Sequence, residues 1–169
     1  TNAQGKIPAN LKQVKNVIMM IPDGTSTSVL SLARWYQSYN STDLIWLTTD
    51  ELVTGLVKTH SSDAPIGDSA PTGSTYASGV VSQAGYVSPY PEKTEHHIVP
   101  VATALSNAPA FTILAAAQLK GTAIGLAFTC DFTHATPADF SAHSPARSNR
   151  EAIAPLLVYN HIHVIFCGG

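Results

Sequence analysis

The chain has 169 residues, of which 44% are hydrophobic and 12% are charged, and its formal net charge is -2. These values are typical of a soluble globular α/β domain with an ordinary core. No run of basic residues points to nucleic-acid recognition, and no apolar stretch is long enough for a membrane span. Because the charged share is about half the usual one, we expect other protein to cover much of this surface.

The first part of the chain predicts two strands and a helix. Residues 14–21 are mostly apolar and are followed by Pro22-Asp23-Gly24, which indicates a buried strand that ends in a turn. Residues 25–28 can cap a helix over residues 29–36. Residues 52–60 alternate between apolar and polar side chains, as a second strand would.

A segment of small residues runs from Ile66 to Gly79, and Ser69 stands near its start. If a helix begins at Asp68 or Ser69, backbone N–H groups without intrahelical partners converge near the Ser69 hydroxyl, and the helix dipole favours an anion there. A phosphate group is therefore the first expected ligand. The alternative is structural, because Asp or Ser before such a helix is commonly only an N-cap.

The second part of the chain alternates helices with strands after a long loop. Residues 82–99 contain Gly85, Pro89 and Pro91 and indicate an excursion over the surface. Beyond the loop we expect, in chain order, a helix over 101–119, a strand over 122–129, a helix that starts at Thr136-Pro137 with the proline at its first position, a helix around 150–159 and a strand over 163–166. Strands separated by helices predict a parallel sheet, in which ligands bind at the carboxyl ends of the strands.

Asp23 would lie at such a strand end. An isolated Asp-Gly is commonly a turn and nothing more. A carboxylate in this place is also well situated to bind a divalent cation, since carboxylate oxygens are common ligands of such ions. Ser69 follows the second predicted strand and could reach the same edge of the sheet.

Three blocks of the sequence together resemble the alkaline phosphatase family, and in particular one bacterial branch of it. The blocks are residues 17–24 with 33–36, residues 67–71 with 76–79, and residues 132–138 with Ala142, His143 and Arg147. They occur in the family's order across nearly the whole chain. The resemblance implies an α/β fold with the parallel-sheet sandwich of alkaline phosphatases, incomplete at its C-terminal side, and residues 1–169 as the N-terminal part of a single catalytic domain.

The resemblance implies which residues handle phosphate. Ser69 would be the nucleophile that becomes phosphoserine. Arg147 would bind two phosphate oxygens with its guanidinium, a geometry that lysine cannot reproduce. Asp68 would orient Arg147, and all three residues would contact the substrate. Without the resemblance, Arg147 would be interpreted as a solvated loop charge.

The resemblance also implies metal ligands. Asp23 would bridge a zinc ion and a third, usually magnesium, ion, and Thr136 would bind that third ion through its hydroxyl. Ser69 would be a further ligand. His134 stands where the best-known bacterial enzymes have Asp, and imidazole suits zinc or cobalt better than magnesium. The structural alternatives are an N-cap for Thr136 and a surface or hydrogen-bonded core histidine for His134.

The implied activity is the hydrolysis of phosphate monoesters with two zinc ions and one magnesium ion as cofactors and inorganic phosphate as product. A homodimer and a periplasmic or extracellular location are expected from the resemblance alone. The family's remaining metal ligands lie in sequence beyond residue 169, so we expect residues 1–169 by themselves to be inactive. Two alternatives stay open: a phosphodiesterase or phosphonate hydrolase of the same superfamily, and a catalytically silent polypeptide that binds phosphate or metal.

Overall fold

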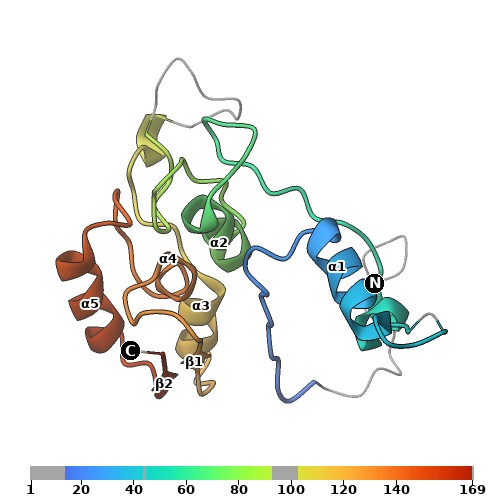
Figure 1. The fold of residues 1–169 in the computed structure, drawn as a ribbon. Coiled ribbons are helices and arrows are strands. Elements are labelled where there is room, and N and C mark those ends of the chain that lie inside the picture. Colours follow the sequence, from blue (N-terminus) through green and yellow to red (C-terminus); the bar gives the residue numbers. More distant parts are fainter. Residues whose placement is uncertain (1–13, 44, 93–102, 169) are drawn as a thin grey trace, which may run out of the picture. The chain divides into compact units, whose positions relative to one another are not determined.

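The computed structural model describes residues 14–43, 45–92 and 103–168 (Figure 1). The chain divides into two compact units, Thr1–Leu52 and Val53–Gly169, and each is described by itself. In the described ranges, no helix has the length and apolar character needed to cross a membrane.

The first unit is built around one helix, α1, which spans Thr27–Ser38. Its N-cap is Ser26, whose side chain accepts a hydrogen bond from the Val29 N–H at 3.4 Å. A short 3₁₀-helix over Thr48–Leu52 follows. The helix expected around residues 29–36 is therefore confirmed, together with its cap.

Both strands expected in the first 60 residues are wrong. Residues 14–21 and 53–60 form no strand, and residue 52 ends the 3₁₀-helix. A strand exists only where a neighbour accepts its backbone hydrogen bonds, and in the described part of the chain neither segment has such a neighbour. The apolar side chains of the first segment are exposed, with Val17, Ile18 and Met20 each 85% or more accessible to solvent.

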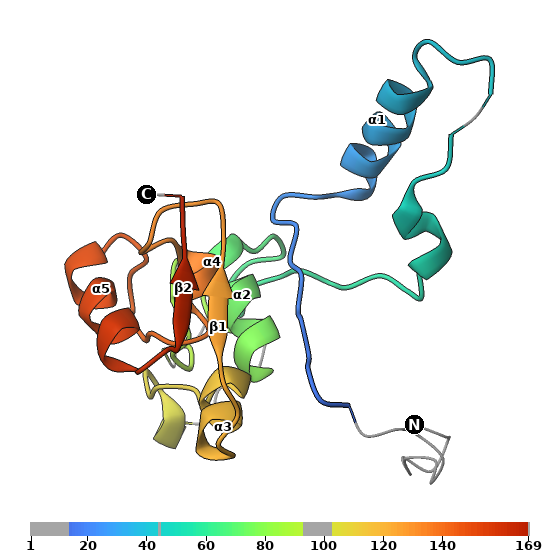
Figure 2. The same cartoon turned by 90° about the horizontal axis from the view of Figure 1, so that it is seen from below.

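The second unit contains the remaining elements. They are helices α2 (Ser69–Ser78), α3 (Ile113–Leu119), α4 (Ala135–Ala138) and α5 (Arg150–Tyr159), a 3₁₀-helix over Thr103–Leu105, and strands β1 (Gly125–Ala127) and β2 (Val164–Phe166). The two strands pair in parallel, with Leu126 opposite Ile165 (Figure 2). This α/β arrangement with a small parallel sheet is the fold class expected from the sequence.

Small residues bring the helices of the second unit close together. Helix α2 lies beside α4 (Figure 1), and its Ala70, Gly73 and Ala77 are buried. The buried core comprises Ala70, Val87, Ala135, Ala138, Ala142, Ile153 and Leu157. With so many alanines the backbones approach closely, which places polar groups at the helix ends near one another.

Three expectations for the second unit need correction. In residues 103–119 only Thr103–Leu105 and Ile113–Leu119 are helical, because Asn107 takes a left-handed conformation (φ 58°) and Pro109 follows it. Helix α4 begins at Ala135 with His134 as N-cap, so Pro137 is its third residue and not its first. Proline is tolerated there because the first N–H groups of a helix lack intrahelical acceptors.

The third correction concerns residues 82–99, which are not a surface excursion in their described part. Ser82, Val87 and Ser88 are fully buried. Two isolated antiparallel bridges, Val87 with Ser144 and Pro89 with Pro109, tie this segment to later parts of the chain. The His96-His97 pair lies outside the described residues. The helix around residues 150–159 and the strands at 125–127 and 164–166 are confirmed.

Candidate active site

Asp68 and Ser69 form the N-terminus of helix α2, as the sequence predicts. Asp68 is the N-cap, and its Oδ1 accepts a hydrogen bond from the Ala70 N–H at 2.8 Å. Its Oδ2 accepts another from the Gly85 N–H at 3.1 Å. Ser69 is the first residue of the helix, so its hydroxyl lies at the end where backbone N–H groups favour an anion.

Arg147 reaches this helix end from a distant part of the sequence. Its Nη1 donates to Ser69 Oγ at 3.0 Å and to Asp68 Oδ1 at 3.3 Å. Its backbone N–H donates to the Gly85 carbonyl at 2.8 Å. The structure therefore brings together the three residues that the sequence analysis assigned to phosphate.

His134 lies next to the same arginine. Its Nε2 is 3.5 Å from Arg147 Nη2, while its Nδ1 is buried and has no hydrogen-bond partner in the described part of the protein. A buried nitrogen without a partner is costly unless something else binds it. Thr136 lies two residues further along, in α4, where it is not the N-cap.

Asp23 belongs to the first unit. It lies in the turn that the Thr25 N–H closes on the Pro22 carbonyl at 3.2 Å, and Gly24 takes the left-handed conformation (φ 70°) that this turn requires. The turn predicted there is confirmed. A metal-binding role for Asp23 stays a prediction.

The sequence analysis missed a buried polar cluster of Ser74, Ser88 and Asp139. All three residues are fully buried. Burial raises the pKa of the Asp139 carboxyl well above its usual range, and a hydrogen bond from Ser74 opposes this effect. The one available signal was the carboxylate itself, which stands between the apolar residues Ala138 and Phe140.

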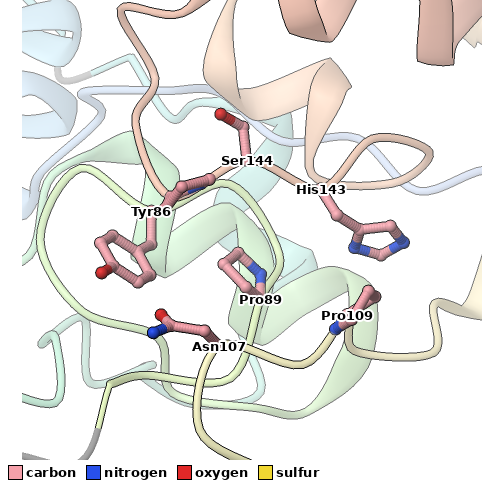
Figure 3. A pocket seen from close by; sticks show the side chains of 7 residues that line it. Tyr86, Pro89, Asn107, Pro109, His143 and Ser144 are labelled. Carbon is pink, nitrogen blue, oxygen red and sulfur yellow. The ribbon is translucent and has the colours of Figure 1, made fainter.

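A hollow of about 320 Å³ lies beside the loop that follows Tyr86. Its walls come from three segments that converge in Figure 3: Tyr86 and Pro89, Asn107 and Pro109, and His143 to Pro145. None of the six predicted site residues lines it.

His143, which lines the hollow, is half-buried. Burial lowers the pKa of His143, and its Nδ1 lies 3.1 Å from the Ser88 carbonyl. His143 is thus a hydrogen-bonded histidine of the scaffold.

The alkaline phosphatase family model matches residues 14–162. The chain belongs to the alkaline phosphatase family. The resemblance and the fold class stated from the sequence are confirmed. Two residues that contact each other here, Ser69 and Arg147, both fall within the matched range.

Relatives in several kingdoms share this similarity. The chain is 33% identical to alkaline phosphatase 3 of Bacillus subtilis over 90% of this chain and 31% of that protein. It is 35% identical to the repressible alkaline phosphatase of Saccharomyces cerevisiae over 83% of this chain and 23% of that protein. The chain therefore spans about a third or less of the length of these relatives.

Solved alkaline phosphatases share the fold. The cold-active enzyme of a Shewanella species matches with a TM-score of 0.69 and 28% identity over 85% of this chain and 33% of that one. The Thermus thermophilus enzyme matches with a TM-score of 0.65 and 27% identity over 82% of this chain and 27% of that one. The Antarctic TAB5 enzyme, in a mutant whose histidine is replaced by glutamate and which has magnesium bound in the M3 site, matches with a TM-score of 0.60 and 21% identity over 79% of this chain and 35% of that one.

Proposed function

We propose that this chain carries the nucleophile and the phosphate-binding arginine of a phosphate monoester hydrolase. The observation that supports this most strongly is the contact of Arg147 Nη1 with Ser69 Oγ at 3.0 Å, at the N-terminus of α2. A hydroxyl and a guanidinium that meet at the positive end of a helix dipole are suited to a tetrahedral dianion.

The reaction proceeds in two displacements at phosphorus. Ser69 Oγ loses its proton and forms a bond to phosphorus as the ester oxygen departs with the electron pair of its bond; the alkoxide takes up a proton, which leaves a phosphoserine and an alcohol. Water then loses a proton and bonds to phosphorus, and the Ser69 oxygen departs with the electron pair of its bond and is reprotonated, so that inorganic phosphate is released. Arg147 holds the non-bridging oxygens in both steps, and Asp68 keeps the guanidinium beside Ser69 through its 3.3 Å contact.

The residues present fit part of a metal site. The Nδ1 of His134 has no hydrogen-bond partner among the described residues and is a nitrogen that a metal ion could use. We propose Asp23, Ser69 and Thr136 as further ligands of two zinc ions and one magnesium ion. Bound zinc would supply positive charge that favours the ionised serine and the departing oxygen. The described residues contain no group of three or more His, Cys, Asp or Glu that could hold a metal, so other residues must complete these sites.

Histidine at position 134 bears on which ion occupies the third site. Imidazole nitrogen binds zinc or cobalt more readily than magnesium, which prefers oxygen ligands. The TAB5 mutant with magnesium in its M3 site carries a carboxylate in place of a histidine, and this agrees with that preference. We propose that His134 lets zinc or cobalt compete with magnesium for the third site.

The first test measures turnover of p-nitrophenyl phosphate by the complete gene product that carries these residues, with zinc and magnesium supplied. Ser69→Ala is expected to lower kcat by at least about a thousandfold. Ser78→Ala, at the other end of α2, is the matched control and is expected to change kcat by less than about threefold. Residues 1–169 by themselves are expected to show negligible turnover.

A second substrate tests the reaction class. We expect bis(p-nitrophenyl) phosphate to react far more slowly than p-nitrophenyl phosphate, because the Asp68–Arg147 arrangement suits a dianionic phosphate monoester. Faster turnover of the diester would overturn the proposal in favour of a phosphodiesterase. The same proposal includes a homodimer, a periplasmic or extracellular location, and residues 1–169 as the N-terminal part of a single catalytic domain.

A further inference from the structure

A buried hydrogen-bonded cluster lies behind the candidate active site. We call Ser74, Ser88 and Asp139 the Asp139 cluster. Ser74 Oγ donates to Asp139 Oδ1 at 2.8 Å and accepts from the Ser88 N–H at 2.8 Å. The Ser88 hydroxyl donates to the backbone carbonyl of Asp139. The cluster thus joins helix α2, the residue after helix α4 and the loop that contains Ser88.

The Asp139 carboxyl also touches the backbone of α2 directly. A Cβ atom placed on Gly73 would lie 2.2 Å from Asp139 Oδ2, so only glycine leaves room for this oxygen. Asp139 Oδ2 has no hydrogen-bond partner in the described part of the chain. Burying a carboxyl costs free energy, so a gain in stability does not readily explain why Asp139 is buried. A role in fixing the geometry of the elements around it is the better explanation.

The loop held by the cluster contacts both sides of the site. At residue 85, the Gly85 N–H donates to Asp68 Oδ2 at 3.1 Å, and the Gly85 carbonyl accepts from the Arg147 N–H at 2.8 Å. At residue 87, the Val87 N–H donates to the Ser144 carbonyl at 2.8 Å, and the Val87 carbonyl accepts from the Ser144 N–H at 2.9 Å. Residues 85–88 are therefore one short segment that is bonded to Asp68, the N-cap of α2, and to residues 144–147, which include Arg147.

We propose that Asp139 is a positioning residue for the reaction. It fixes segment 85–88 against helix α2, and through that segment it sets the placement of the Arg147 guanidinium relative to Ser69 Oγ. The inference rests on the proposed function, since it assigns Asp139 a task in the same site. Among the described residues no hydrogen bond joins Asp139 to Ser69, and the connection runs through Ser74, Ser88 and Gly85.

The expected effect is on the chemical step. A shift of about 1 Å between a nucleophile and its substrate can cost about a hundredfold in rate. Loss of the cluster leaves every phosphate-binding group present but lets segment 85–88 move, so kcat should fall more than KM rises. Asn keeps the shape of the carboxyl and the acceptor for the Ser74 hydroxyl, and should preserve the geometry.

The test compares four variants of the complete gene product. Asp139→Ala and Ser74→Ala remove the cluster, whereas Asp139→Asn is the conservative rescue. Thr112→Ala is the matched control, because its buried hydroxyl donates to the Phe140 carbonyl and caps α3 without a bond to segment 85–88. We measure kcat and KM at a temperature where each variant is folded, and amide hydrogen exchange of the peptide that contains residues 85–88.

We expect Asp139→Ala and Ser74→Ala to lower kcat by about ten- to a hundredfold and to speed exchange of the Val87 and Ser88 amides. The kcat of Asp139→Asn should stay within about threefold of the wild type, and Thr112→Ala should lose thermal stability only.

If Asp139→Ala does not fold, the kcat and amide exchange of Ser74→Ala provide the test. Wild-type kcat in Ser74→Ala with unchanged exchange would overturn the inference. An inactive wild-type protein would instead overturn the proposed function, and the exchange experiment would still decide whether the cluster holds segment 85–88.

Discussion

The two units of the chain differ in how they use their apolar side chains. None of the described residues in the first unit is buried, and large apolar residues such as Ile18, Met20 and Trp35 are exposed. The second unit has a tight core of alanines with Ile153 and Leu157. Large exposed apolar areas normally mark contact with other protein, and many exposed apolar side chains agree with the low charge of the chain.

An Arg–Asp pair of the first unit, Arg34–Asp50, and one of the second unit, Arg147–Asp68, are built differently. In the first unit both carboxylate oxygens of Asp50 accept from the Arg34 guanidinium, and Oδ2 accepts from the Leu47 N–H at 2.9 Å as well. In the second unit Arg147 approaches Asp68 with Nη1 alone and shares that nitrogen with Ser69. The first pair is closed, because the guanidinium bonds to both carboxylate oxygens, whereas the guanidinium of the second pair also contacts the Ser69 hydroxyl.

The largest expected difference between the pairs is catalytic. Arg147→Ala should lower kcat/KM on p-nitrophenyl phosphate by about a hundred- to a thousandfold, because it removes the donors that we propose hold the phosphate oxygens. Arg147→Lys should recover only a small part of this loss, since an ammonium lacks the planar pair of donors.

Arg34→Lys is the matched variant in the first unit and should leave kcat/KM within about threefold of the wild type. Steady-state kinetics on the complete gene product gives all three values. Equal losses at positions 34 and 147 would contradict the distinction between a closed pair and a phosphate-binding pair.

The next effect concerns packing in the second unit. Gly73→Ala should cost about 1–3 kcal/mol of unfolding free energy, because the new Cβ would overlap the Asp139 carboxyl in a core with no free space. Gly55→Ala is the control, since a Cβ there meets nothing within 4 Å. Thermal unfolding of both variants measures the difference, and a stable Gly73→Ala protein would show that the contact between α2 and Asp139 is loose.

The smallest effect is a change in the pH dependence of stability. Burial raises the pKa of Asp139 in the folded state, so its contribution to stability is complete below the pKa of the unfolded chain and is lost as pH rises through the folded pKa. Asp139→Asn removes this dependence, because the amide does not titrate.

The measurement is the thermal midpoint of the wild type and of Asp139→Asn from acidic to mildly alkaline pH. The stability of the variant relative to the wild type should rise with pH. A relative stability that falls with pH would mean that the carboxylate is stabilised in its charged form, contrary to its buried surroundings.

The sequence predicted local features where one residue type has a definite conformational role. Ser26 and Asp68 cap helices α1 and α2 as expected, and Asp23-Gly24 forms the predicted turn. These features depend on hydrogen bonds to near neighbours in the chain. The pairing of Ser69 with Arg147 could be predicted only from the family resemblance, because the two residues are 78 positions apart.

The failures concern features that depend on distant partners. Residues 14–21 have a strand-like pattern, yet pairing requires a second strand at their side. Residues 82–92 carry loop-forming prolines, yet Val87 and Pro89 are buried, because they bridge to Ser144 and Pro109. No sequence pattern predicts that Asp139 is buried, because its hydrogen-bond partners Ser74 and Ser88 are distant in the sequence.

The most direct test of the central claim is to trap the phosphorylated enzyme. The complete gene product is incubated with a phosphate monoester, quenched in acid and digested, and the peptides are sequenced by mass spectrometry. We predict one phosphoryl group on Ser69 and none on the same peptide of Ser69→Ala. Turnover of the monoester with the phosphoryl group on another residue, or undiminished turnover by Ser69→Ala, would contradict the account.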